Sequence, residues 1–208
     1  GNHVIRMAKY SRLIAEQLGL STEECDAIEM AAPMHDIGKI CIPLEILQKT
    51  APLNLEERCQ LEHHALAGYA LLAYYLRDPR CLAARAARDH YERRDGSGYP
   101  RGIHLRDPMV EIIVACDVFD ALTCDRPYRK RWSHAKAVAH IREQSGRHFD
   151  PRVVTAEHGW WYPEIKTPDH GWDISNANIL TDNAYESCDP AMGATSVRTL
   201  LCSIRPKK

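Results

Sequence analysis

Apolar residues recur at helical spacing along the chain up to about residue 150, which places them on one face of successive helices. The first stripe consists of Val4, Met7, Ala8, Ile14 and Leu18. Gly19 follows it and is expected to end this helix, because glycine readily adopts the left-handed backbone found after helix C-termini. The pattern therefore predicts helices joined by short loops.

Capping residues mark where further helices begin. Ser21 with Glu24, and Asn54 with Glu57, have the spacing of capping boxes. Starts are also predicted near Pro79 and directly after the capping residues Asp107, Ser133 and Asp150. The helix after Ser133 is expected to stop at Gly146. Together these elements predict an all-α fold.

Several of these helices carry histidine or aspartate. The helix after Ser21 is expected to run into His35-Asp36, with a kink at Pro33 because proline cannot donate a backbone hydrogen bond. The helix after Asn54 carries the adjacent pair His63-His64, and the one from Pro79 ends close to His90. The helix over 110–122 is almost wholly apolar but contains two aspartates, Asp117 and Asp120.

The pattern changes near Ala156. The remaining segment is rich in Trp, Asn, Asp, Pro and Gly, has no helical periodicity, and ends in the extended stretch 199–204. We expect a domain over 1–155 and an irregular, partly extended tail over 156–208. Partial packing is expected at Trp160-Trp161, with a loose extension beyond Pro168.

Composition narrows the range of partners. The chain has 208 residues, 45% hydrophobic and 26% charged, as in an ordinary globular protein. A net charge of -1 gives no general attraction to nucleic acid, so we expect no DNA partner and expect any anion to be held by a local patch. No run approaches the roughly 18 apolar residues that span a bilayer. Because the chain begins at Gly1 rather than with Met, we expect upstream segments.

Eight cysteines are present, none in a C-x-x-C pair, and several fall in apolar helical stretches. We interpret them as buried, reduced thiols of a cytoplasmic protein rather than a disulfide framework.

Charged carboxylates are seldom buried unless they are paired or bind metal. An adjacent His-Asp pair, two further histidines and a late aspartate on an apolar helix therefore indicate a metal centre. The order of His35-Asp36, His64, His90, Gly98-Tyr99-Pro100 and Asp117 resembles the HD-GYP family of metal-dependent phosphodiesterases that degrade cyclic di-GMP. The resemblance covers about residues 1–155 and implies an HD-superfamily helical bundle.

The resemblance implies two divalent metal ions. His3, His35, Asp36 and Asp117 are expected around one, with Asp36 as the bridge, and His64 and His90 at the second. His64 is chosen over His63 because Gly68 follows it one turn later on the same face. His3 rests on the motif Asn2-His3-x-x-Arg6. The mixed imidazole and carboxylate set favours iron or manganese.

The resemblance also implies substrate contacts. Lys39, three residues after Asp36, is expected to touch the scissile phosphate and, with Asp36, to take part in catalysis. Arg126 and Arg129 belong to a basic segment after Asp117 whose guanidinium groups suit phosphate oxygens. Tyr99 is expected to present its ring to a guanine base. Alternatively, the Gly98-Tyr99-Pro100 loop contacts a partner such as a diguanylate cyclase domain.

One position departs from the family pattern. The family usually has His-His-Glu before the Gly-Tyr-Pro loop, with both histidines as ligands, whereas this chain has His90-Tyr91-Glu92. A neutral phenol is a poor ligand for a divalent metal. We therefore expect Tyr91 to weaken the second metal site.

The favoured function is hydrolysis of cyclic di-GMP to pGpG, and onward to GMP. No residue stands out as the proton donor for the leaving 3′ oxygen. One rival is a catalytically impaired module that binds nucleotide or a partner domain. Its metal content would distinguish it from an active enzyme. Another is an HD phosphohydrolase acting on a different nucleotide, which a substrate panel would separate.

The tail offers a third, unrelated class. Residues 158–164 and 175–181 resemble the C-terminal end of molybdopterin-guanine-dinucleotide oxidoreductases. Because so short a segment cannot rebuild the cofactor-binding domain of that family, we expect a fragment without function of its own. A chain ending near Val154 is expected to fold and to keep its activity.

Overall fold

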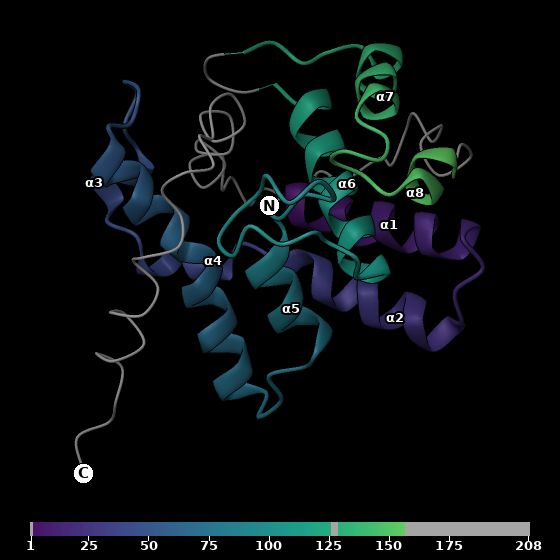
Figure 1. The fold of residues 1–208 in the computed structure, drawn as a ribbon, viewed down its shortest axis with the longest axis horizontal. Helices are drawn as coiled ribbons and strands as arrows, with labels where there is room; N and C mark the ends of the chain where they lie inside the picture. The colour runs from purple at the N-terminus through teal and green to yellow at the C-terminus, as the bar shows by residue number, and fades with distance from the viewer. Residues whose placement is uncertain (1, 126–128, 157–208) are drawn as a thin grey trace.

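The computed structural model describes residues 2–125 and 129–156, and these form a helical bundle (Figure 1). The α-helices are α1 (Asn2–Gln17), α2 (Thr22–Ala31), α3 (Leu44–Leu47), α4 (Leu55–Tyr75), α5 (Leu82–Asp89), α6 (Pro108–Thr123), α7 (His134–Glu143) and α8 (Pro151–Thr155). Two 3-10 helices, η1 (Ala32–Met34) and η2 (Ile37–Cys41), lie between α2 and α3. The described residues contain isolated β-bridges but no strand, which confirms the all-α prediction. None of the described helices is long and apolar enough to cross a membrane.

Local capping fixes most helix starts where the sequence predicted them. Ser21 and Asn54 each accept from the backbone of a residue three positions on, and both capping boxes are complete. Asp107, Ser133 and Asp150 cap α6, α7 and α8 through their side chains. Each cap satisfies backbone N–H groups that the helix itself leaves unpaired. These five helix starts were therefore predictable from local chemistry.

The helix α6 forms the centre of the bundle. All residues from Val110 to Leu122 are buried, which accounts for its apolar character on every side. Helices α1, α5, α7 and α8 all contact it, and Figure 1 shows α1 and α5 beside α6 with α7 next to its C-terminal end. Any charged side chain on α6 must therefore find its partners inside the protein.

The segment carrying His35 and Asp36 differs from its prediction. A helix continuous from Ser21 to Asp36 is wrong: α2 ends at Ala31, η1 follows with Pro33 in its first turn, and His35-Asp36 form a turn before η2. The proline has no N–H to continue the α-helical ladder, so the chain tightens into 3-10 geometry instead of kinking.

Smaller differences occur elsewhere. The short helix α3 was not predicted, α5 begins at Leu82 rather than near Pro79, and α7 ends at Glu143, before Gly146. Val4 is 37% exposed, whereas Met7 and Ile14 of the same predicted stripe are fully buried. Six cysteines of the described residues are free thiols, as predicted, but only Cys25 and Cys116 among them are buried, and the prediction of buried thiols is wrong for Cys41 and Cys59, which are exposed. The predictions for the tail beyond residue 156 lie outside the described residues.

Two glycines bring η2 against α4. A Cβ on Gly38 would lie 1.9 Å from the carbonyl oxygen of His64 and 2.5 Å from the backbone nitrogen of Gly68. A Cβ on Gly68 would lie 3.2 Å from the Ala87 Cβ of α5. This close approach sets the distance between Asp36, just before η2, and His64 of α4.

Candidate metal centre

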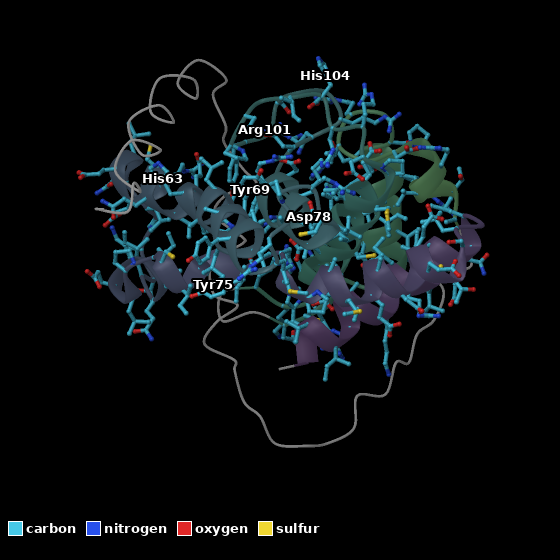
Figure 2. The ribbon with its side chains drawn as sticks, turned by 90° about the horizontal axis from the view of Figure 1, so that it is seen from below. His63, Tyr69, Tyr75, Asp78, Arg101 and His104 are labelled. Carbon is cyan, nitrogen blue, oxygen red and sulfur yellow. The ribbon has the colours of Figure 1, made fainter. Side chains whose placement is uncertain are left out.

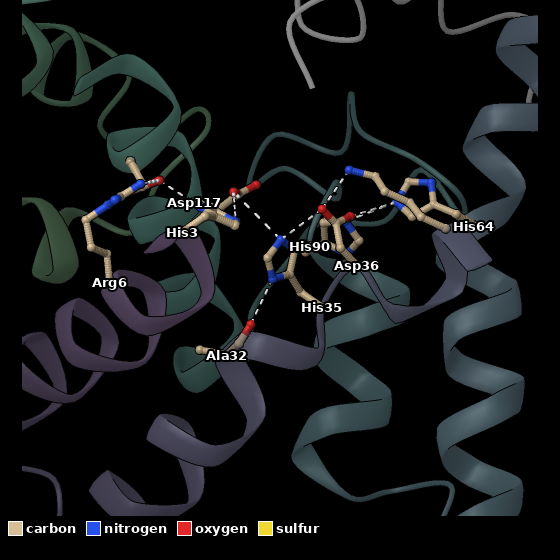
Figure 3. A network of polar contacts seen from close by, with 10 residues as sticks. His3, Arg6, Ala32, His35, Asp36, His64, His90 and Asp117 are labelled. Atoms are coloured by element: carbon tan, nitrogen blue, oxygen red, sulfur yellow. Dashed lines mark hydrogen bonds and ion pairs between the residues drawn. The ribbon is translucent and has the colours of Figure 1, made fainter. Parts of the chain in front are cut away.

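Six side chains form two adjacent donor groups inside the bundle (Figure 3). In each group, one donor atom per residue lies within 4.8 Å of the others. The first group consists of His3, His35 and Asp117, and the second of Asp36, His64 and His90. The structure thus brings together all six residues predicted as metal ligands.

Five elements contribute to the two groups. His3 lies in the first turn of α1, His64 in the middle of α4, His90 at the C-terminal cap of α5 and Asp117 in the middle of α6. The turn between η1 and η2 supplies His35-Asp36. Because these elements are far apart in sequence, only the packed bundle assembles the groups.

The first group centres on one carboxylate oxygen. The Oδ1 atom of Asp117 lies 3.7 Å from Nε2 of His3 and 3.7 Å from Nε2 of His35. All three residues are buried. The spacing leaves room for a cation between the two imidazoles and the carboxylate.

Asp36 lies between the two groups. Its Oδ2 atom is 3.3 Å from Nε2 of His35, while its Oδ1 atom is 3.5 Å from Nε2 of His64 and 3.6 Å from Nε2 of His90. From the resemblance, Asp36 was expected around the first metal and as the bridge. The structure places Asp36 within the second group and keeps its other oxygen near His35, as a bridging carboxylate requires.

The four imidazoles share one orientation. Each engages a fixed acceptor through Nδ1 and turns Nε2 towards the groups: His3 to Asp120 at 2.7 Å, His35 to the Ala32 carbonyl at 2.8 Å, His64 to the Leu61 carbonyl at 2.6 Å, and His90 to the Ala87 carbonyl at 3.0 Å. Since a carbonyl oxygen can only accept, Nδ1 carries the proton in the three histidines that face one. Their Nε2 atoms then point inward, as in metal-ligating histidines.

Several inward-facing atoms lack a hydrogen-bond partner. Nε2 of His35, Oδ1 of Asp36 and Oδ1 of Asp117 are buried and unpaired. Nε2 of His64 faces Nε2 of His90 at 3.3 Å, so two lone pairs oppose each other if both rings are neutral. A buried polar atom without a partner is costly, and a cation between these atoms would satisfy all of them at once. The donor set therefore suits divalent metal ions.

Charge acts differently on the two groups. Burial lowers the pKa of His35, but the neighbouring carboxylates of Asp36 and Asp117 outweigh it and raise that pKa to about 9. Burial also lowers the pKa of His64, and because Asp36 and the hydrogen bond to Leu61 raise it by less, the pKa falls to about 3. Burial raises the pKa of Asp36, yet Lys39 and His35 hold it well below its usual range. The carboxylate between the groups is therefore charged and ready to bind a cation.

Lys39 is paired with Asp36, the carboxylate between the two donor groups. Its Nζ donates to Oδ2 of Asp36 at 2.6 Å, and its side chain is only 12% exposed. The predicted placement on the same side as Asp36 is what the structure shows. Its contact with a phosphate stays a prediction.

Asp120 supports the first group from behind. It accepts from Nδ1 of His3 and pairs with the Arg6 guanidinium, with Nη2 at 3.0 Å from Oδ2. Its pKa is raised by burial but lowered more by His3 and Arg6. From the sequence, Asp120 was only a second aspartate in an apolar helix, with no predicted role. A charged residue in an otherwise apolar helix, one turn after Asp117, was the sequence feature that could have indicated this supporting role.

The predicted substrate residues have different outcomes. Tyr99 stacks on Tyr91, with ring centroids 4.6 Å apart, and Tyr91 in turn lies against His64 and His90. Arg129 donates to the Ala121 carbonyl at 2.6 Å, near the end of α6. Arg126 lies outside the described residues. The substrate roles of Tyr99, Arg126 and Arg129 stay predictions.

The remaining described histidines stay out of both donor groups. His63 is half-buried on α4, next to His64, and Figure 2 places it on the surface of that helix. His104 is exposed and His148 is buried beside Arg93. The choice of His64 over His63 therefore agrees with the geometry.

Comparisons with known proteins agree with this geometry. The HD domain family matches residues 1–153. The chain is 45% identical over 153 residues to "Cyclic di-GMP phosphodiesterase response regulator RpfG" of Xanthomonas campestris, covering 73% of this chain and 40% of that protein. It is 36% identical to "3'3'-cGAMP-specific phosphodiesterase 2" of Vibrio cholerae, covering 74% and 30%. The chain thus spans less than half the length of these relatives.

A solved structure shares the fold. The crystal structure of a cyclic GMP-AMP specific phosphodiesterase of V. cholerae (V-cGAP3) superposes with a TM-score of 0.54 at 21% identity, covering 75% of this chain and 42% of that one. The likeness of the tail to molybdopterin oxidoreductases stays unsupported, because the family match ends at residue 153. Residues 1–153 are therefore an HD domain, and the chain belongs to the HD-GYP family.

Proposed function

We propose that this chain hydrolyses a phosphodiester bond of a cyclic dinucleotide, with cyclic di-GMP as the substrate and pGpG as the first product, which is then cut to GMP. The observation that supports this most is the pair of donor groups with the Asp36 carboxylate between them. The names of two relatives mention cyclic di-GMP and 3'3'-cGAMP, so both substrates belong in the test.

Two divalent ions, iron or manganese, suit the proposed centre. His3, His35 and Asp117 would hold one ion, and Asp36, His64 and His90 the other. When bound there, such ions supply positive charge to phosphate oxygens and lower the pKa of water. The chain contributes imidazoles whose Nε2 atoms already face inward and a charged carboxylate between the two groups.

The other residues bind and orient the substrate. Lys39, held 2.6 Å from Asp36, brings a positive charge to the edge of the centre, where a phosphate can replace part of its pairing. Arg129, near the end of α6, and Arg126 extend that positive charge along the substrate. Tyr99 offers an aromatic surface for a base. The Gly98-Tyr99-Pro100 loop is also the proposed contact for a diguanylate cyclase domain.

The test is a substrate panel on protein purified without oxygen and analysed for bound metal. Cyclic di-GMP, 3'3'-cGAMP and a non-cyclic phosphodiester are incubated separately, and products are separated by chromatography. We expect pGpG and GMP from cyclic di-GMP, and no product from Asp36→Asn. Binding without hydrolysis in metal-poor protein would favour an impaired binding module, and turnover of the non-cyclic compound alone would favour a different phosphohydrolase.

A further inference from the structure

The loop that carries Tyr99 is joined to the segment just after His90. The Tyr99 N–H donates to the Tyr91 carbonyl at 3.2 Å. A Cβ on Gly98 would lie 2.3 Å from the same carbonyl oxygen, so the two backbones are in close contact there. Tyr91 therefore fixes the backbone position of Tyr99.

The side chains of these two tyrosines are also in contact. Their rings are 4.6 Å apart and inclined by only 14°, which is a stacked arrangement. The Tyr91 ring is 4.3 Å from the His90 ring and 5.4 Å from the His64 ring, which it meets edge to face. With 7% exposure, Tyr91 is buried between the second donor group and Tyr99.

Two carboxylates join this segment to the residues that follow Tyr99. Glu92 accepts from the backbone N–H groups of Arg101 and Ile103, at 2.6 and 3.0 Å. Asp89 is held by the Arg101 guanidinium, with both contacts at 2.9 Å, and also by Arg88. The return arm of the loop is thus bound by residues on both sides of His90-Tyr91.

We propose that Tyr91 is a positioning residue, whose ring holds the Tyr99 ring beside the Asp36, His64 and His90 group and so sets the affinity for the substrate base. The proposal rests on the proposed function, in which Tyr99 contacts the substrate. A ring already fixed in its binding position loses little conformational freedom when a base stacks on it. This role needs the aromatic ring of Tyr91 and not its hydroxyl.

Enzyme kinetics and metal analysis of three variants test the proposal. Tyr91→Leu is expected to raise KM about three- to tenfold, the range for losing an aromatic pair, with a smaller change in kcat. Tyr91→Phe keeps the stack and is expected to restore KM. Tyr75→Leu makes the same change at a tyrosine that is 73% exposed on α4 (Figure 2) and serves as the matched control. Both Tyr91 variants are expected to keep the metal content of the wild type, and loss of metal in Tyr91→Phe would overturn the proposal by making the hydroxyl a ligand.

A second measurement needs no substrate. Fluorotyrosine is incorporated, and the fluorine resonance of Tyr99 is identified from its loss in Tyr99→Phe. We expect it to shift in Tyr91→Leu and not in Tyr75→Leu, and an unmoved resonance in Tyr91→Leu overturns the positioning role. If the resonance shifts but the wild type cleaves no cyclic dinucleotide, the proposed function fails while the positioning of Tyr99 by Tyr91 stands.

Discussion

The two donor groups differ in what surrounds them. Behind the first, Asp120 and Arg6 hold His3, and the carboxylates of Asp36 and Asp117 raise the pKa of His35 to about 9. Behind the second, backbone carbonyls orient His64 and His90, Tyr91 forms an aromatic wall, and the pKa of His64 falls to about 3.

This difference ranks the two groups as metal sites. A cation is favoured where negative charge is already concentrated, and the first group has more of it, because Asp117 belongs to that group and Oδ2 of Asp36 lies 3.3 Å from Nε2 of His35. The second group shares the single carboxylate of Asp36 with Lys39. We therefore expect tighter metal binding at the first group, and the following variants test that ranking.

The largest effect is expected at His64. His64→Ala removes one of three donors of the second group, so we expect that group to lose its metal. Hydrolysis should then fall by more than about 100-fold, which exceeds the usual effect of removing a residue that only hydrogen-bonds to a metal ligand. The first group should keep its metal. Elemental analysis and product chromatography measure both.

The neighbouring histidine provides the control. His63→Ala alters the same helix outside the donor groups and should change neither quantity, while His64→Gln checks that lost volume is not the cause. Equal metal loss in the two alanine variants would show that the ligand was misassigned.

The contact between η2 and α4 is the next most sensitive place. A methyl on Gly38 would overlap the His64 carbonyl, 1.9 Å from the added carbon, and backbone cannot move aside as a flexible side chain does. We expect Gly38→Ala to lower the free energy of unfolding by about 3 kcal/mol and to separate Asp36 from the second group. Denaturant melts and metal content measure this.

Gly68→Ala is the milder variant with which Gly38→Ala is compared. Its nearest contacts are at 3.2 Å, so we expect a cost of about 1 kcal/mol and retained metal. A Gly38→Ala protein as stable as Gly68→Ala would show that the two elements are not held as closely as the structure has them.

Asp120 tests the first group alone. Asp120→Asn removes the charge that holds His3 and leaves Arg6 without its carboxylate, so we expect metal affinity at the first group to fall about 10- to 100-fold. The second group should be unaffected. Asp78→Asn, on the exposed turn after α4, is the control (Figure 2). Metal titration that shows equal losses at both groups would contradict the separate support inferred for them.

Local chemistry explains why much of this was predictable. The capping boxes at Ser21 and Asn54 act over three residues, so the sequence contains all that is needed to place those helix starts. The ligands could be selected because the resemblance gave their order, and because Gly68 distinguished His64 from His63.

Other features depend on packing between distant segments. The contact of Asp120 with His3 joins residues 117 positions apart, and the place of Asp36 between both groups depends on η2 lying against α4. The end of α2 at Ala31 was predictable only in part: Pro33 indicated that the helix would be interrupted there, but not that the chain would continue as a 3-10 helix. The stacking of Tyr91 on Tyr99 likewise had no local signal.

The smallest expected effect is a gain at the second group. Tyr91→His places an imidazole, which is a far better donor than a neutral phenol, beside His64 and His90. We expect more metal bound per chain than in the wild type, with the increase confined to the weaker site and therefore abolished in Tyr91→His combined with His64→Ala. Elemental analysis at matched metal concentration measures this. The same change replaces the ring on which Tyr99 stacks with a smaller one, so KM should rise even as metal content increases. If position 91 affected metal binding alone, KM would not rise together with metal content. Unchanged metal content and rate in Tyr91→His would mean that the second group is already complete with Asp36, His64 and His90, and that the two groups are more nearly equal than their surroundings imply.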